Sequence, residues 1–196
     1  MPFKRYPLLR QRALYQGLMF ASFSLFWTAA PLLLSSVYGL SQTQIALFAL
    51  VGAIGAVAAP IAGRMADAGH TEKMSKFAMV LAVISFVPVF FNLPHGVIFM
   101  ALTGVLLDFA VQMNMVLGQR AVYTLDPHSR GRLNALYMTS IFIGGALGSI
   151  LASVVYAHGG WIYVAAIGSA LPLLALILFM RISALSSSNS QKQVHV

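Results

Sequence analysis

The chain has 196 residues, of which 59% are apolar and only 8% are charged. Soluble domains are about 25% charged, so this chain has too little polar surface to cover a water-soluble globule. Its net charge of +8 would suit a nucleic-acid ligand, but the long apolar stretches exclude a soluble nucleic-acid-binding protein. The chain contains no cysteine, which excludes disulfides, thiolate metal sites and cysteine nucleophiles.

Six charge-poor apolar stretches predict an all-α membrane protein, with spans at 13–36, 43–63, 76–92, 97–117, 133–156 and 161–181. Each is close to the ~20 residues that cross a bilayer, and none alternates as the strands of a membrane β-barrel do. The first run is longer than the ~7–15 apolar residues of a signal peptide, so we interpret it as an uncleaved span. Ser41 and Gln44 form a capping-box pattern at the start of the second span. The polar tail at 182–196 is predicted to be disordered.

Lys and Arg residues sort to one side of these spans. They occur in the basic N-terminus at 1–12, between spans two and three, between spans four and five, and in the tail, whereas the three opposite connections contain none. Because basic residues of short loops remain cytoplasmic, we expect a multi-pass membrane protein with both termini in the cytoplasm. The positive charge also suits anionic inner-leaflet lipid.

The six spans divide into two triplets that run in opposite directions, an arrangement typical of transporter half-domains. The second span of each triplet is rich in small residues, which let helices approach closely. The glycines that we expect to mediate helix packing are Gly52, Gly55, Gly144, Gly145 and Gly148.

Asp108 is the only acidic residue inside a predicted span, where a charged Asp costs about 2.5–3.5 kcal/mol on insertion scales. Gln112 and Gln119 follow on the same helical face. One interpretation is that Asp108 binds a proton or a cationic substrate in an aqueous cavity. The alternative is a neutral Asp that is hydrogen-bonded to another helix.

Aromatic residues form a stripe on the first span, with Phe20, Phe23 and Trp27 at helical spacing. The stripe could line a pocket for apolar or cationic ligands, or face lipid or a neighbouring helix. Ser149 and His158 prompt comparison with intramembrane serine proteases, but Ser149 lacks the following glycine of a nucleophile elbow and His158 falls at the opposite membrane edge. No phosphate loop, metal cluster or flavin motif occurs, so we expect no enzyme activity and no cofactor.

The loop after the second span resembles the G-x-x-x-D-(R/K)-x-G-(R/K) motif of the major facilitator superfamily (MFS). Gly63, Arg64, Asp67 and Gly69 carry the likeness, although Ala68 replaces a basic residue and Gly69 comes one position early. Segments 107–112 and 126–137 are similar to those of bacterial members that resemble drug/proton antiporters, which implies a location in the bacterial inner membrane. The resemblance covers residues 12–181 and implies the C-terminal six-span half of a twelve-span transporter. It further implies that spans one and four line the cavity and that the glycine-rich spans pack against the other half.

Two interpretations of such a half remain open. It can be a truncated half that needs a missing N-terminal half, because alternating access requires two halves that rock against each other. It can also associate with a second copy into a transporter or channel, or serve as a membrane scaffold. Lipophilic cations, sugars and amino-acid derivatives all remain candidate substrates, and the coupling ion and direction of transport are open.

Overall fold

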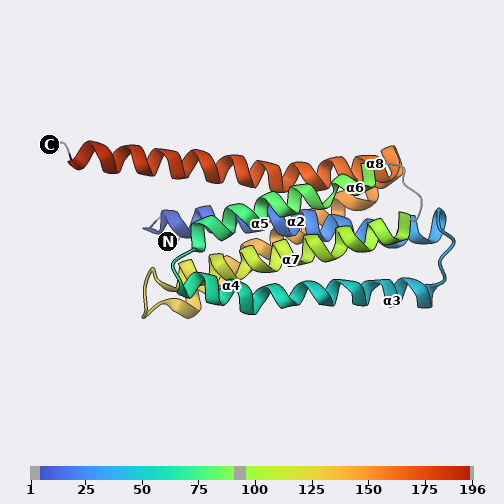
Figure 1. Cartoon of the computed structure of the whole chain (residues 1–196), viewed down its shortest axis with the longest axis horizontal. Helices are drawn as coiled ribbons and strands as arrows, with labels where there is room; N and C mark the ends of the chain where they lie inside the picture. Colours follow the sequence, from blue (N-terminus) through green and yellow to red (C-terminus); the bar gives the residue numbers. More distant parts are fainter. Residues whose placement is uncertain (1–4, 91–95, 195–196) are drawn as a thin grey trace.

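The computed structural model describes the backbone of residues 5–90 and 96–194, and the side chains of these residues up to 184. The described chain is a bundle of long, roughly parallel helices (Figure 1). Five of its helical segments are long and apolar enough to cross a membrane. The helices begin with α2 (Pro7–Ser36), which starts six residues before the predicted span because Pro7 is well placed at a helix N-terminus.

The second crossing is built from three consecutive helical pieces: α3 (Gln42–Gly52), the 3₁₀ turn η1 (Ala53–Val57) and α4 (Ala58–Asp67). The predicted capping box at its start is confirmed. The Ser41 hydroxyl accepts from the backbone N–H of Gln44, and the backbone N–H of Ser41 donates to the Gln44 side chain.

The third crossing consists of α5 (Thr71–Ser85) and α6 (Val87–Phe90). The end of the predicted span at 76–92 and the predicted turn at 93–96 lie mostly outside the described residues. The fourth crossing is α7 (Gly96–Tyr123), which extends beyond the predicted 97–117 at its second end.

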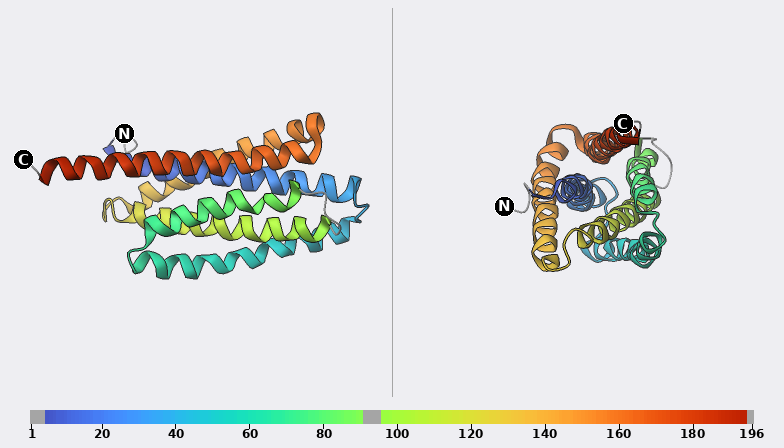
Figure 2. Two further views of the ribbon diagram at one scale, coloured as in Figure 1. Left: turned by 45° about the horizontal axis from the view of Figure 1, so that its top comes forward. Right: turned by 90° about the vertical axis from the view of Figure 1, so that its left-hand side faces the viewer.

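The last two predicted spans form one continuous helical assignment, α8 (Arg130–Val194), which is divided at Gly160. Gly160 has φ 59° and ψ −155°, a conformation that glycine adopts without steric cost. The two arms of α8 therefore turn back on each other at the predicted turn (Figure 2).

The tail differs from the prediction, because the backbone of 182–194 continues the second arm of α8 as a helix. This segment is polar but contains neither Gly nor Pro, so no residue in it interrupts a helix that has already formed.

The two termini lie at the same end of the bundle, together with the α4–α5 and α7–α8 connections (Figure 1). This is the end that carries the basic residues. We call it the basic end. Because α8 turns back at Gly160, the five apolar segments of the described residues cross the length of the bundle six times. The architecture is an all-α membrane fold of two three-helix units.

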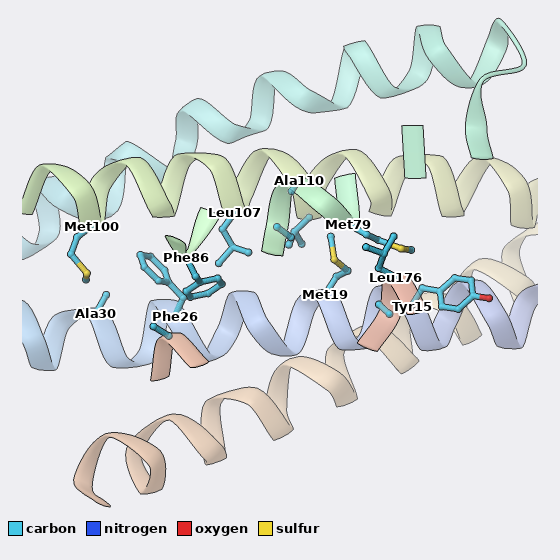
Figure 3. Packing of buried hydrophobic residues seen from close by; sticks show 14 of the residues in the cluster. Tyr15, Met19, Phe26, Ala30, Met79, Phe86, Met100, Leu107, Ala110 and Leu176 are labelled. Atoms are coloured by element: carbon cyan, nitrogen blue, oxygen red, sulfur yellow. The ribbon is translucent and has the colours of Figure 1, made fainter. Parts of the chain in front are cut away.

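The core lies where α2, α5, α7 and the second arm of α8 meet, and Figure 3 shows its apolar side chains. Phe26 of α2 contacts Phe86 and Trp161 edge to face, with ring centroids 6.2 and 5.8 Å apart. The middle helix of each unit packs across onto the other unit. α3, η1 and α4 lie against α7, and the first arm of α8 lies against α2. Asp108 of α7 and the aromatic stripe of α2 also meet here, since Trp27 donates a hydrogen bond to Asp108.

Candidate functional site

A cavity of about 540 Å³ lies between α2, the α3–η1 segment, α7 and the first arm of α8. Its walls are mostly apolar, and Asp108 and Gln112 supply the polar side chains among the described lining residues. Such a pocket, with a few polar groups on an apolar wall, is typical of small-molecule sites.

Asp108 lies near the middle of α7, and its side chain is only 8% exposed. The indole N–H of Trp27 donates a hydrogen bond to its Oδ1 atom over 2.7 Å. No Lys, Arg or His within the described ranges forms an ion pair with it. The described hydrogen-bond donor to this carboxyl group is therefore neutral, and no described cation is paired with it.

Glycines allow the α3–η1 segment to approach Asp108 closely. A Cβ atom on Gly52 would lie 2.5 Å from Asp108 Oδ2 and 2.7 Å from a Trp27 ring carbon, and one on Gly55 would overlap the Asp108 side chain. Both positions therefore exclude larger residues. The 3₁₀ turn η1 occurs at this closest approach, where such turns often mark strain or function.

The aromatic stripe of α2 faces this cavity, since Phe20, Phe23 and Trp27 all line it. The rings of Phe20 and Phe23 are stacked with centroids 5.0 Å apart, and Phe142 of α8 meets Phe20 edge to face at 5.8 Å. Aromatic faces beside a carboxyl group can attract an apolar cation.

Gln112 and Gln119 take different places. Gln112 lines the cavity, whereas the Gln119 amide donates to Asn134 Oδ1 at 2.8 Å and lies outside it. Both residues share a helical face, but seven residues of α-helix extend about 10 Å, which carries Gln119 beyond the cavity to the start of α8.

A buried amide pair that sequence reasoning missed joins α2 to α7. Asn114 donates to Gln16 Oε1 at 2.7 Å, and Gln16 donates to the Val111 carbonyl at 3.1 Å. Both side chains are at most 3% exposed. Two amides within otherwise apolar spans were the available signal, because a buried amide needs a partner.

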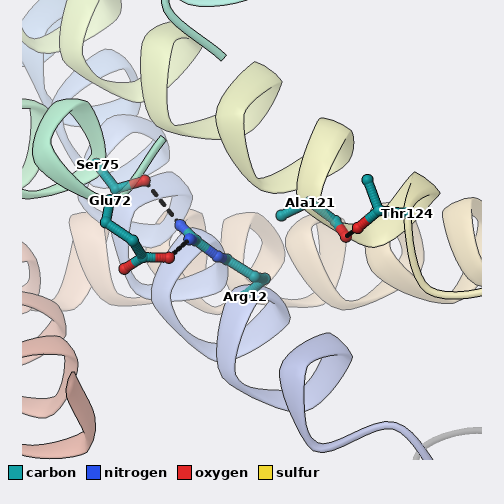
Figure 4. Close-up of polar contacts among 5 residues, drawn as sticks. All are labelled: Arg12, Glu72, Ser75, Ala121 and Thr124. Atoms are coloured by element: carbon teal, nitrogen blue, oxygen red, sulfur yellow. Dashed lines mark hydrogen bonds and ion pairs between the residues drawn. The ribbon is translucent and has the colours of Figure 1, made fainter. Parts of the chain in front are cut away.

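Polar contacts at the basic end include two ion pairs. Arg12 of α2, only 3% exposed, pairs with Glu72 of α5 and donates to the Ser75 hydroxyl (Figure 4). In the predicted loop motif, Asp67 accepts a hydrogen bond from Arg120 of α7 at 3.0 Å. Gly63 is buried and lies beside the same Arg120 side chain. Arg64 is exposed, and Gly69 adopts φ +78°.

The glycines of the first α8 arm lie against α2. Gly144 and Gly148 approach the backbones of Gly17 and Ala21, and Gly145 contacts the Phe20 ring. Together with Gly52 and Gly55, they face helices of this chain. The contact of the glycine-rich helices with another half, which the resemblance implies, stays a prediction. A small residue at these sites is needed for the internal packing.

The protease constellation does not form. The Ser149 hydroxyl bonds that of Thr28 at 3.0 Å, and His158 bonds the Val154 carbonyl within its own helix at 2.8 Å. The two side chains thus have separate partners.

The family model described as "Major Facilitator Superfamily" matches residues 13–195. The uncharacterized transporter YgaY of Escherichia coli O157:H7 is 38% identical over 176 residues, which cover 89% of this chain and 44% of YgaY. The probable transporter SCO4007 of Streptomyces coelicolor is 31% identical over 169 residues, 85% of this chain and 39% of the relative. The chain therefore spans less than half the length of these curated relatives.

A crystal structure of a D-xylose-proton symporter has a similar fold. Its TM-score is 0.71 at 18% sequence identity, and the likeness covers 97% of this chain and 53% of the symporter. At this identity the likeness concerns the fold alone.

Proposed function

The chain belongs to the Major Facilitator Superfamily, and on that premise we propose that it forms the C-terminal six-helix half of a proton-coupled secondary transporter. The fold and the family make it a multi-pass membrane protein of a transporter family, and not an enzyme. The proposed location is the bacterial inner membrane, since the relatives come from bacteria. Both termini are proposed to be cytoplasmic, because the basic residues gather at one end.

One observation carries this proposal: a single acid, Asp108, lies near the middle of α7, accepts a hydrogen bond from a neutral partner and faces a cavity. Asp108 gains or loses a full charge when it exchanges a proton, and its indole partner cannot compensate that change. A cationic substrate and a proton would then compete for one carboxylate, which is the physical basis of antiport.

The lining favours a lipophilic cation over a sugar. A sugar presents many hydroxyl groups, each of which needs a partner when it leaves water. The described lining offers two polar side chains, Asp108 and Gln112, beside aromatic and aliphatic groups. An apolar cation requires one counter-charge and apolar or aromatic walls, so it matches this surface better.

Transport requires a second six-helix half, because alternating access is a rocking of one half against another around a central site. The relatives, which are about twice as long as this chain, support that requirement. In the proposed assembly the second half closes the open side of the cavity.

A reconstitution experiment tests the proposal. The chain would be placed in proteoliposomes alone, or together with the part of YgaY that it does not match, and proton flux would be followed with a pH-sensitive dye when tetraphenylphosphonium is added. We expect flux only with both parts, and none when Asp108→Asn replaces the wild-type chain. Asp126→Asn, in the loop before α8 at the basic end, is the control.

Flux from the chain alone would instead support a transporter made of two copies. Undiminished proton flux in an inserted Asp108→Asn variant would remove Asp108 from the mechanism.

A further inference from the structure

A second apolar groove, of about 470 Å³, lies on α2 and α8, on faces that point away from the substrate cavity. On α2 the cavity uses Phe20, Phe23 and Trp27, whereas the groove uses Ala13, Gly17 and Ala21. The two hollows therefore use separate faces of the same helices, and the proposed transport function does not account for the groove.

The geometry of α8 creates this groove. Its arms meet at Gly160 and move apart toward the basic end (Figure 2). α2 contacts both arms. Gly17 packs against Gly144 of the first arm, and the Ser22 hydroxyl donates a hydrogen bond to the Gly168 carbonyl of the second. The small residues of α2 thus line a V-shaped space whose open end is the basic end.

The groove is exposed, apolar along its length and charged at its end. Leu14, Ile143 and Leu147 line it, and their side chains are 50%, 58% and 56% exposed. Arg10, in the first turns of α2, lines it too. Among the described residues, Arg10 has no ion pair and no side-chain hydrogen bond. The apolar groove thus ends at the Arg10 guanidinium, which has no described anionic partner.

The length of the groove matches one leaflet of a bilayer. Eleven residues of α-helix separate Arg10 from Ala21, a rise of about 16 Å, and half of a ~30 Å hydrocarbon core is about 15 Å. A chain that lies on this floor would extend from the membrane surface to its midplane.

We propose that the groove binds one phospholipid of the leaflet at the basic end, with an acyl chain against the exposed side chains of Leu14, Ile143 and Leu147 and an anionic headgroup on Arg10. Arg132 and Arg181 are exposed near the same end of the two α8 arms and add to the attraction for an anionic headgroup. Basic pockets between membrane helices are known to hold such headgroups.

Native mass spectrometry of the full chain, released from nanodiscs that contain equal amounts of phosphatidylglycerol and phosphatidylcholine, tests the headgroup contact. We expect one retained phosphatidylglycerol per wild-type chain. Arg10→Gln should lower its retention about five-fold, which corresponds to the ~1 kcal/mol that a basic residue contributes near an anionic surface. Arg5→Gln is the matched control, because Arg5 is exposed at the same end and stacks on Tyr6.

Two variants test the acyl-chain contact. Leu147→Trp fills the groove from an exposed position and should abolish retention of both lipids, whereas Leu102→Trp, at an exposed site outside the groove, should leave it unchanged. Gly17→Leu blocks the floor, where an added Cβ meets only Ser140 O at 3.5 Å. Glycerol phosphate, which lacks acyl chains, should not displace the lipid.

Equal retention in the wild type, Arg10→Gln and Leu147→Trp would show only an unselective lipid shell and would overturn the proposal. A photoreactive amino acid at Leu14 adds a second measurement. A lipid adduct supports the proposal, and a crosslink to a second copy of the chain at this position refutes it.

Discussion

Asp108 and Glu72 are both carboxylic acids of this bundle, but Glu72 is paired with a cation and Asp108 is not. Glu72 at the basic end is 62% exposed and forms an ion pair with the buried Arg12. Asp108 is 8% exposed, and its partner is the neutral indole of Trp27. The first acid is part of a fixed structural contact, whereas the second can change charge without breaking an ion pair. The burial and the partner of a carboxylate therefore indicate whether its role is structural or functional, which its residue type alone does not.

The largest loss of stability is expected from a substitution at Gly55, where the backbone of η1 lies against Asp108. Gly55→Leu would place a Cβ atom into the Asp108 side chain and 2.8 Å from the Phe109 nitrogen. Overpacking of this kind costs about 1–3 kcal/mol, so we expect a clear drop in the thermal midpoint in detergent and loss of the cavity. Gly131→Leu is the control, because an added Cβ there meets nothing within 4 Å. Wild-type stability of Gly55→Leu would contradict the close approach.

The next largest effect tests the buried cation. Glu72→Leu removes the carboxylate and leaves the Arg12 guanidinium buried with the Ser75 hydroxyl as its hydrogen-bond partner. Hydrogen bonds to charged groups contribute about 1.5–3 kcal/mol, and we expect a loss near the lower end of that range because Glu72 is 62% exposed. Circular dichroism during thermal unfolding measures it, and a loss below ~0.5 kcal/mol would show that Arg12 reaches water.

Asp67→Leu is the matched change at the exposed ion pair. Arg120 and Asp67 are 51% and 63% exposed, and exposed pairs contribute about 0.2–1 kcal/mol. The loss should be smaller than for Glu72→Leu and should shrink as salt is raised, because salt screens exposed charges. An equal loss in both variants would remove the distinction between the two pairs.

The smallest effect concerns Asp126 in the loop before α8. A hydrogen bond from Ser129, with a second from the backbone N–H of His128, lowers the pKa of the Asp126 carboxyl. A pKa that is lower in the folded state stabilises the fold above the unfolded value, ~3.9 for Asp. That contribution is lost as the pH falls through the folded value.

In Asp126→Asn we therefore expect a slightly lower unfolding midpoint at pH 7 and a smaller decline of the midpoint between pH 5 and 3. Thermal scans at a series of pH values measure both, and a decline as steep as in the wild type would exclude Asp126 as its source.

Local signals were sufficient for much of the fold. Apolar length and the Ser41 capping box predicted the crossings because both act within one helix. The prediction missed that residues 182–194 are helical. The polar composition of the tail predicted disorder because the tail can bury little apolar surface. The tail nevertheless continues a helix that is already stabilised by packing, so it needs no core of its own.

Contacts between helices were harder to predict. The aromatic stripe and Asp108 could each be singled out, but no spacing within one helix shows that Trp27 donates to Asp108, 81 residues away. Helical periodicity put Gln119 on the face of Asp108 and Gln112, but it gives only a face and does not show that the cavity ends before Gln119. The Arg12–Glu72 pair, with its buried Arg12, was not predicted because both residues lie in polar segments outside the predicted spans.

Binding of tetraphenylphosphonium to the chain in nanodiscs, read by Trp27 fluorescence in a Trp161→Phe background, tests the role of Asp108 most directly. We predict quenching that weakens as the pH is lowered, because protons and the cation compete for the carboxylate, and loss of binding in Asp108→Asn. Equal affinity in Asp108→Asn, at all pH values, would contradict a cation site at Asp108.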